Sequence, residues 1–153
     1  MAVRKSEKNH APEFSKNLVS DSALRRPEVI VEFIFDRGLL FVAVRNIGDR
    51  PATKISITFD KKIKGLNGTR NFSSLPLFTN LQFLGPQREI VTLLDACASY
   101  FKRKEPTKVS AKICYRDPEN QKYEATINHD LGIYREIVYL NPPASDKAEA
   151  AEV

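Results

Sequence analysis

Hydrophobic residues recur at every second position over much of this chain, and turn-forming residues separate the stretches that show the pattern. Residues 39–59 give the clearest example: an apolar stretch, a turn with Asn46, Gly48 and Pro51, and then an alternation of polar and apolar residues. Successive side chains of a β-strand point to opposite faces, so a repeat of two predicts strands rather than helices. Within residues 39–45, apolar residues occupy both the odd and the even positions, so both faces of the strand are apolar. This is typical of a strand in the middle of a sheet.

The same repeat predicts further strands on both sides of this unit. One is expected over residues 29–35, and two shorter ones over residues 81–84 and 89–94. The clearest hairpin joins residues 107–116 to a return strand through residues 117–120, where Asp and Pro occupy the first two positions of a type I turn.

Three segments have less regular patterns. Residues 61–79 form a long connection, whose apolar residues at 75–78 should fold back over the edge of the core. Residues 96–101 are expected to form one helical turn. Residues 131–140 fit both a helical stripe and an alternating strand, so their structure stays open at this point.

About seven short strands and almost no helix predict an all-β fold, an immunoglobulin-like antiparallel β-sandwich. We expect the sandwich over residues 28–140, between a flexible basic N-terminal arm, residues 1–27, and a disordered C-terminal tail, residues 141–153. The arm carries six Lys or Arg residues against three acids, and the tail carries one Lys against three acids. The net charge of +5 therefore divides into +3 for the arm, −2 for the tail and +4 for the sandwich.

The composition is that of a soluble protein with one domain. Of 153 residues, 42% are hydrophobic and 28% are charged, and a chain of this length can bury a core without disulfides or metal ions. No stretch approaches the roughly 18 apolar residues of a membrane span, and the first residues contain no apolar run of a signal peptide. These features predict a cytoplasmic protein with no membrane span.

Few residues could carry catalysis or hold a metal ion. The chain has two cysteines, Cys97 and Cys114, outside any Cys-x-x-Cys motif, and two histidines. A cysteine nucleophile could use His129 as its base, but the expected hairpin register puts Cys114 many residues away from His129. Asp117 and Glu119 lack the spacing of a calcium-binding loop. We therefore predict a protein that is not an enzyme and has no cofactor and no metal site.

The expected strand order gathers basic residues at one end of the sandwich. In an immunoglobulin-type sandwich, the loops after the first, third and fifth strands meet at the same end. The basic residues of these loops are Arg37, Lys61, Lys62, Lys64, Arg70, Lys102, Arg103 and Lys104. Such an end is either a solvated surface or a binding site for an anionic partner, such as an acidic protein, a phospholipid headgroup or a nucleic acid. Against nucleic acid in particular, the aromatic residues fall on core positions rather than among the basic ones.

Three short motifs resemble those of a known group of domains. Residues 44–52 read V-x-N-x-G-x-x-P-A, Leu84-Gly85-Pro86 precedes a strand, and Tyr115-Arg116-Asp117 precedes the last clear strand. Over roughly residues 28–130 the chain is similar to immunoglobulin-like domains of prokaryotic proteins, the CARDB and fibronectin-III-like groups, in which the first motif links the second and third strands. The resemblance implies a non-catalytic structural or binding module.

We therefore expect a structural or protein–protein interaction module, such as an accessory subunit of a larger assembly. Its partner would be another protein, docked through a sheet edge, the flanking arms or the apolar segment after the last clear strand, which could add to a partner's sheet. The candidate docking residues in that segment are Ile133, Tyr134, Ile137 and Tyr139. The alternative is a protein that binds an anionic surface through the basic end.

Overall fold

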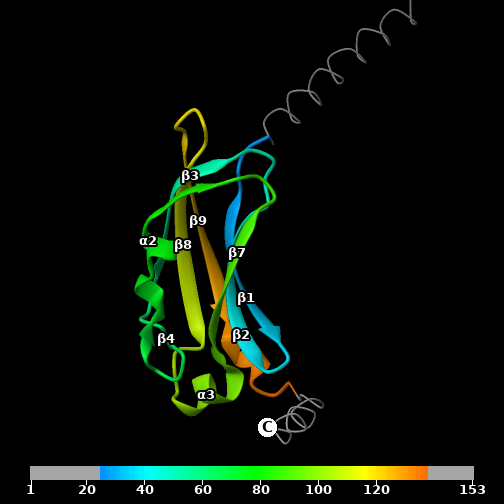
Figure 1. Ribbon diagram of the computed structural model, residues 1–153, viewed down its shortest axis with the longest axis vertical. Helices are drawn as coiled ribbons and strands as arrows, with labels where there is room; N and C mark the ends of the chain where they lie inside the picture. Colours follow the sequence, from blue (N-terminus) through cyan, green and yellow to red (C-terminus); the bar gives the residue numbers. More distant parts are fainter. Residues whose placement is uncertain (1–24, 138–153) are drawn as a thin grey trace, which may run out of the picture.

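Two antiparallel sheets packed face to face make up the described part of the chain, residues 25–137 of the computed structural model (Figure 1). The three-stranded sheet has the order β1 (Val29–Asp36), β2 (Leu39–Asn46), β7 (Glu89–Ala96). The four-stranded sheet has the order β6 (Leu81–Leu84), β3 (Ala52–Phe59), β8 (Lys108–Arg116), β9 (Lys122–Asp130). The all-β sandwich is thus confirmed. Two further strands, β4 (Lys64–Gly65) and β5 (Arg70–Asn71), pair in the connection after β3, which brings the number of strands to nine.

Short helices lie in the connections. They are η1 (Phe72–Ser74), α2 (Pro76–Thr79), α3 (Cys97–Lys102) and η2 (Leu131–Tyr134). The helical turn expected over residues 96–101 is confirmed as α3, and the segment that fitted both helix and strand begins as the 3₁₀ helix η2. The predictions for residues 1–24 and 138–153 lie outside the described residues. None of the described helices is both long enough and apolar enough to cross a membrane.

The order of the strands differs in one place from that of a constant-type immunoglobulin domain. In that fold the first, second, fourth and fifth strands share a sheet. Here the fourth of the seven long strands, β6, pairs instead with β3 in the other sheet, and β7 returns to pair with β2. The sandwich therefore has three strands on one side and four on the other.

The core lies between the sheets and is built by the predicted inward positions. Val31 of β1, Val42 of β2 and Ile113 of β8 are at most 1% exposed. At one end the core is closed by Tyr100 of α3 and Phe78 of α2, which are fully buried. The segment at residues 75–78 was expected to cover the core edge, and Phe78 does so by packing edge-on against Phe59, with ring centroids 5.0 Å apart. Burying a side chain of this size contributes about 1.5–3 kcal/mol to stability.

At the opposite end, the Asn46 side chain links the two sheets by hydrogen bonds. Its Oδ1 accepts hydrogen bonds from the backbone N–H groups of Glu28 (3.1 Å) and Gly48 (3.0 Å), and its Nδ2 donates to the carbonyls of Arg50 (2.8 Å) and Leu84 (3.1 Å). All four hydrogen bonds of the amide are made although Asn46 is only 1% exposed.

Gly48 completes the same turn. A Cβ at this position would collide with the carbonyl oxygen of Arg26 and the backbone of Pro27 and Glu28. Pro27, which the sequence placed in the arm, is buried there. The Asn-x-Gly motif is therefore explained by the fold, because it lets the chain entering β1 cross the turn between β2 and β3.

Candidate interaction surfaces

The cysteines and the histidine considered as catalytic residues lie apart. Cys97 begins α3 at one end of the sandwich, whereas Cys114 is on the outer face of β8. In the β8–β9 ladder Cys114 lies opposite Glu124, and His129 lies opposite Val109, five positions further along. Both thiols are free, and burial raises the pKa of each, which keeps the thiols protonated at neutral pH.

His129 packs in the gap between the sheets. Its ring meets Phe33 of β1 edge-on, with centroids 4.9 Å apart, and its Nε2 is buried without a hydrogen-bond partner among the described residues. Burial lowers the pKa of His129, while the backbone of Val31 and the charge of Glu32 act in the opposite direction. The partly buried ring is therefore held in its neutral form at the edge of the core. Within residues 25–137, no group of three or more His, Cys, Asp or Glu side chains could hold a metal ion.

The loops after β1, β3 and β7 meet at one end, so the structure brings the basic loop residues to the same end. The N–H of Cys97 donates to the carbonyl of Gly38 (2.8 Å), and Nη2 of Arg103 donates to the carbonyl of Lys64 (3.0 Å). Figure 1 shows α3 and β4 together at this end. The side chain of Lys61 is also held there, because its Nζ donates to the carbonyl of Lys108 (2.9 Å).

Arg103 differs from the other basic residues of this end because acids neutralise it. Its guanidinium lies 2.8 Å from Oδ2 of Asp95 and 3.3 Å from Oε2 of Glu105, and the three side chains are only 21%, 4% and 14% exposed. Asp95 also accepts hydrogen bonds from the N–H groups of Asn67 and Ala96. Arg103 therefore holds the loops together. Lys62, Lys102 and Lys104 are exposed and make no ion pair within the described residues.

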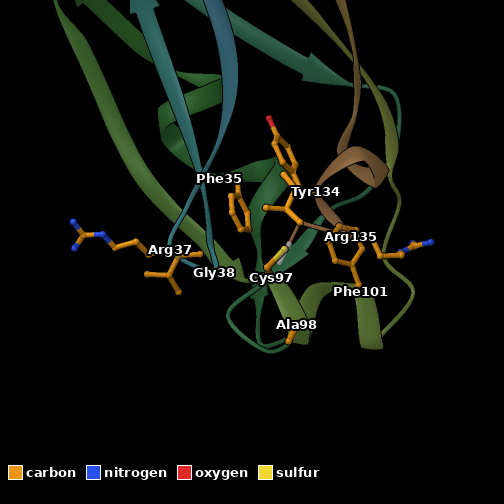
Figure 2. Close-up of a pocket in the computed structure, with 10 residues that line it drawn as sticks. Phe35, Arg37, Gly38, Cys97, Ala98, Phe101, Tyr134 and Arg135 are labelled. Atoms are coloured by element: carbon orange, nitrogen blue, oxygen red, sulfur yellow. The ribbon is translucent and has the colours of Figure 1, made fainter. Parts of the chain in front are cut away.

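A pocket of about 730 Å³ opens at the same end, between the β1–β2 turn, α3 and the segment after η2 (Figure 2). Its lining residues are Phe35, Arg37, Gly38, Leu39, Cys97, Ala98, Phe101, Tyr134, Arg135 and Ile137. The rings of Phe35 and Tyr134 stack on one side, with centroids 5.5 Å apart. The guanidinium of Arg135 lies 4.8 Å from the centre of the Phe101 ring. In Figure 2 the guanidinium groups of Arg37 and Arg135 point away from each other and out of the pocket. The interior is therefore mainly apolar.

The candidate docking segment contributes to this pocket and to the chain's own core. Leu131 is 1% exposed, and the hydroxyl of Tyr134 donates to the carbonyl of Phe33 (3.3 Å). Ile133 and Ile137 are 64% and 47% exposed. Tyr139 lies outside the described residues. Of the described candidates, Ile133 and Ile137 are thus the two that present their side chains to solvent.

The outer face of the three-stranded sheet is apolar, which the sequence analysis did not identify. In the ladders, Ile34 of β1, Phe41 of β2 and Leu93 of β7 form one row, and the next row consists of Glu32, the fully buried Ala43 and Val91. Val91 is 45% exposed. The described helices lie along the side and at the lower end of the sandwich, and none of them covers this face (Figure 1). We call it the apolar face; its residues are Ile30, Ile34, Leu39, Phe41, Ala43, Val91 and Leu93.

Charged residues lie within and beside the apolar face: Glu32 is in the row of Ala43 and Val91, and Arg45 and Glu89 are in the row of Ile30. Arg45 lies between Glu32 and Glu89, with its Nη1 2.9 Å from Oε1 of Glu32 and its Nε 3.2 Å from Oε1 of Glu89. Hydrogen bonding to Glu32 raises the pKa of Arg45. Asp36, at the end of β1, is a third acid on this side. Asp36 in turn lies 3.9 Å from Nε of Arg37, so three acids and two Arg residues leave this side with a net charge of −1, in a protein whose net charge is +5.

A signal for this face is present in the sequence. The apolar residues at both the odd and the even positions of residues 39–45 were interpreted as a strand in the middle of a sheet, and β2 is central in its sheet. Ile30 and Ile34 show the same feature in β1. Apolar residues at the outer positions of two neighbouring strands would have predicted an apolar outer sheet face. They could not have predicted that no described helix covers it.

Comparison with protein families gives one match, the model of a domain of unknown function (DUF8453), over residues 2–135. The chain belongs to this family. The match includes every long strand, the apolar face and most of the pocket, and it ends two residues before Ile137. No curated protein and no solved structure matches the chain.

Proposed function

We propose that this DUF8453 domain is a non-catalytic protein-interaction module of the immunoglobulin-like type, and that it docks a partner protein through the apolar face. The observation that carries the proposal is the row Ile34–Phe41–Leu93 with the neighbouring Val91, on the outside of a sheet and without a covering layer among the described residues. Of these residues Val91 is 45% exposed, and Ile34, Phe41 and Leu93 are partly exposed; apolar side chains gathered on an outer sheet face are typical of interaction sites.

Phe41 is the expected anchor of this interface. It lies on the central strand, between Ile34 and Leu93, so a partner centred on the face would bury it most completely. A few central residues, with aromatic ones enriched among them, carry most of the energy of a typical interface. Burial of one such side chain contributes about 1.5–3 kcal/mol, and we expect Phe41 to dominate.

The charges around the face indicate the chemistry of the partner. Glu32, Glu89 and Asp36 outnumber Arg45 and Arg37 by one charge on this side. Complementary charges steer association and select partners, so the partner presents an apolar surface flanked by basic side chains. The proposed role is that of an accessory subunit in a larger cytoplasmic assembly. The two free thiols, Cys97 and Cys114, suit a reducing compartment.

The test uses an exposed position on each sheet. Val91→Asp places a charge on the apolar face, and Thr126→Asp places the same charge on the outer face of β9, which is also the edge strand of its sheet. Proteins captured from native cells by the wild-type chain should be lost with Val91→Asp and retained with Thr126→Asp, as measured by quantitative mass spectrometry. Equal capture by the two variants would contradict the proposal.

A second candidate function is the binding of an anionic surface through the basic end. The ammonium groups of Lys62 and Lys102 favour it, because they are exposed and make no ion pair with any residue from 25 to 137. Each basic residue near an anionic membrane contributes about 1 kcal/mol, so changing both to Glu should weaken binding to phosphatidylserine vesicles by about thirtyfold or more. The control changes Lys112 and Lys122, on the outer face of the four-stranded sheet, to Glu. No vesicle binding by the wild-type chain at low salt would exclude this function.

A further inference from the structure

The backbone along the outer edge of β9 has no partner among the described residues. β9 is the last strand of the four-stranded sheet and pairs with β8 alone. Beyond its two ends, the N–H of Leu131 donates to the carbonyl of Thr107 (2.7 Å), and the N–H of Asp117 donates to the carbonyl of Gln121 (3.0 Å). The bonded pairs of an antiparallel ladder recur at every second residue, so the odd-numbered residues of β9 bond to β8. The residues whose N–H and C=O groups point away from the sheet are therefore Lys122, Glu124, Thr126, Asn128 and Asp130.

β9 lacks the features that usually protect a long strand edge. Such edges are normally interrupted by a proline or a bulge, or carry a charge that points inward. The register of β9 with β8 runs without a shift from Lys122 to Asp130, and its inward residues are Tyr123, Ala125, Ile127 and His129. The edge of the neighbouring strand β1 is partly closed by contrast, because the carbonyl of Phe33 accepts a hydrogen bond from the hydroxyl of Tyr134 (3.3 Å).

We propose that β9 pairs antiparallel with β9 of a second copy of this chain, around a two-fold axis at Thr126. The charges of the strand fit this register. Lys122 then lies opposite Asp130 of the second copy, Glu124 lies opposite Asn128, and the two Thr126 side chains face each other. Pairs of opposite charge and pairs of threonines are favourable across a ladder. The outward backbone groups of all five even-numbered residues find partners in this arrangement.

Neighbouring symmetric registers lose this match. An axis at Glu124 would bring the two Glu124 side chains face to face, and an axis at Ile127 would place Glu124 opposite Asp130. Like charges directly opposite each other are destabilising. An axis at Ala125 would leave Lys122 without an acid, because Asn128 would lie opposite it. The axis at Thr126 is thus the one that joins the opposite charges and pairs the whole strand.

The inner side of the β9 edge has room for the second copy. Ala125 and Ile127 of β9, Val29 of β1 and Tyr115 of β8 line a groove of about 220 Å³. Ala125 is exposed although it lies opposite Ile113, a core residue of β8. In the proposed register Ile127 of the second copy lies beside Ala125, so its side chain covers this groove. In strand addition, backbone hydrogen bonds supply affinity and such pockets supply specificity.

This pairing goes beyond the proposed docking and is independent of it, because the apolar face belongs to the other sheet. Thr126→Asp, the control of the docking experiment, places two like charges at the axis and should weaken the dimer. Capture of a partner by that variant shows that docking does not need the dimer. A crosslink from position 126 to a second copy is told apart from a partner adduct by its mass.

The first experiment measures the dissociation constant of the full chain by analytical ultracentrifugation. Lys122→Glu should weaken the dimer by about tenfold or more, because the two-fold axis places a like-charge pair with Asp130 at two positions. Asp130→Lys should weaken it similarly, and the double variant Lys122→Glu, Asp130→Lys should return to within about threefold of the wild type. Lys54→Glu, on the central strand β3, makes the same change in net charge and is the matched control.

A second variant tests the backbone. Thr126→Pro removes an N–H group that β8 does not use, and proline is tolerated at such positions of edge strands, so this variant should fold and stay monomeric. A wild-type chain that remains monomeric up to about 1 mM would overturn the proposal. So would a dimer that Lys122→Glu does not weaken, or one that the double variant does not restore. A dimer that is lost with Val91→Asp but kept with Thr126→Pro would also overturn it, since the copies would then meet through the apolar face.

Discussion

The outer faces of the two sheets differ although their inner faces are alike. On the four-stranded sheet, the outer positions of β8 and β9 alternate regularly with core residues; they are Lys108, Ser110, Lys112, Cys114, Arg116, Lys122, Glu124, Thr126, Asn128 and Asp130. On the three-stranded sheet, the corresponding positions form the apolar face. An antiparallel sheet with one face in water normally alternates between apolar and polar residues. The inner faces alone are sufficient for the fold, so the apolar face needs another explanation, and we assign it to a partner.

The charges of the two outer faces differ as well. The apolar face has three acids and two Arg residues in and beside it, whereas β8 and β9 carry four basic residues and two acids on their outer faces. The apolar face therefore has a net charge of −1 and the outer face of β8 and β9 a net charge of +2; on β6, the same outer side also carries Phe83, which is 60% exposed. This polarity gives an incoming partner one preferred orientation.

The strongest test of the contrast compares two valines of the three-stranded sheet. Val42 of β2 is fully buried and faces the core, whereas Val91 of β7 is 45% exposed and faces outward. Val42→Asp should lower the free energy of unfolding by more than about 4 kcal/mol, because it buries an unpaired charge. Val91→Asp should lower it by less than about 1 kcal/mol, as at other surface sites. Denaturant unfolding measures both. A similarly large loss for Val91→Asp would mean that the apolar face belongs to the core of the free protein.

A smaller effect is expected at the link between the sheets. Asn46→Ala removes four hydrogen bonds, of which the one to the carbonyl of Leu84 is buried and the other three are partly buried. We expect the free energy of unfolding to fall by about 3 kcal/mol. Asn128→Ala, on the exposed outer face of β9, should change it by no more than about 0.5 kcal/mol. Thermal melts of both variants test this, and equal losses would show that the Asn46 amide does not link the sheets.

The smallest effect is expected at the edge where β1 and β9 meet. Burial lowers the pKa of His129 in the folded chain, so below about pH 6.5 the unfolded chain binds a proton that the folded chain does not. Stability from this residue is present above pH 6.5 and is lost as the pH falls towards the lowered pKa. Each unit of lowering corresponds to about 1.4 kcal/mol. Between pH 7.5 and pH 5.5 the free energy of unfolding should therefore fall less in His129→Phe than in the wild type. Unfolding curves at the two pH values measure this difference. The lowered pKa of His129 would be contradicted if acidification from pH 7.5 to pH 5.5 stabilised the wild type relative to His129→Phe.

Much of the fold could be predicted because it depends on local patterns. The repeat of two located the long strands, and the Asp117-Pro118 turn is confirmed by the hydrogen bond from the N–H of Asn120 to the carbonyl of Asp117 (2.9 Å). The helical turn α3 also follows from its own residues. The segment at residues 131–140 could not be decided, because the same apolar residues satisfy both periods. The packing of Tyr134 against Phe35 is what favours η2.

The candidate surfaces were less predictable because they depend on which segments meet. Arg103 is neutralised by Asp95, which lies at the end of β7. The two residues are separated in sequence by α3 and meet only in the folded chain. The pocket combines a β-turn with a segment about a hundred residues further along the chain. The apolar face required knowing that no further layer follows β2 among the described residues, and alternation within one strand does not contain that information.

Site-specific photo-crosslinking in native cells tests the central claim most directly. A benzophenone side chain is placed at position 91, on the apolar face, or at position 126, on the outer face of β9. The account predicts one dominant protein adduct from position 91, its loss when Phe41→Ala is added, and no such adduct from position 126. Equal adducts from both positions, or an adduct at position 91 that is unaffected by Phe41→Ala, would contradict the assignment of the apolar face as the docking surface.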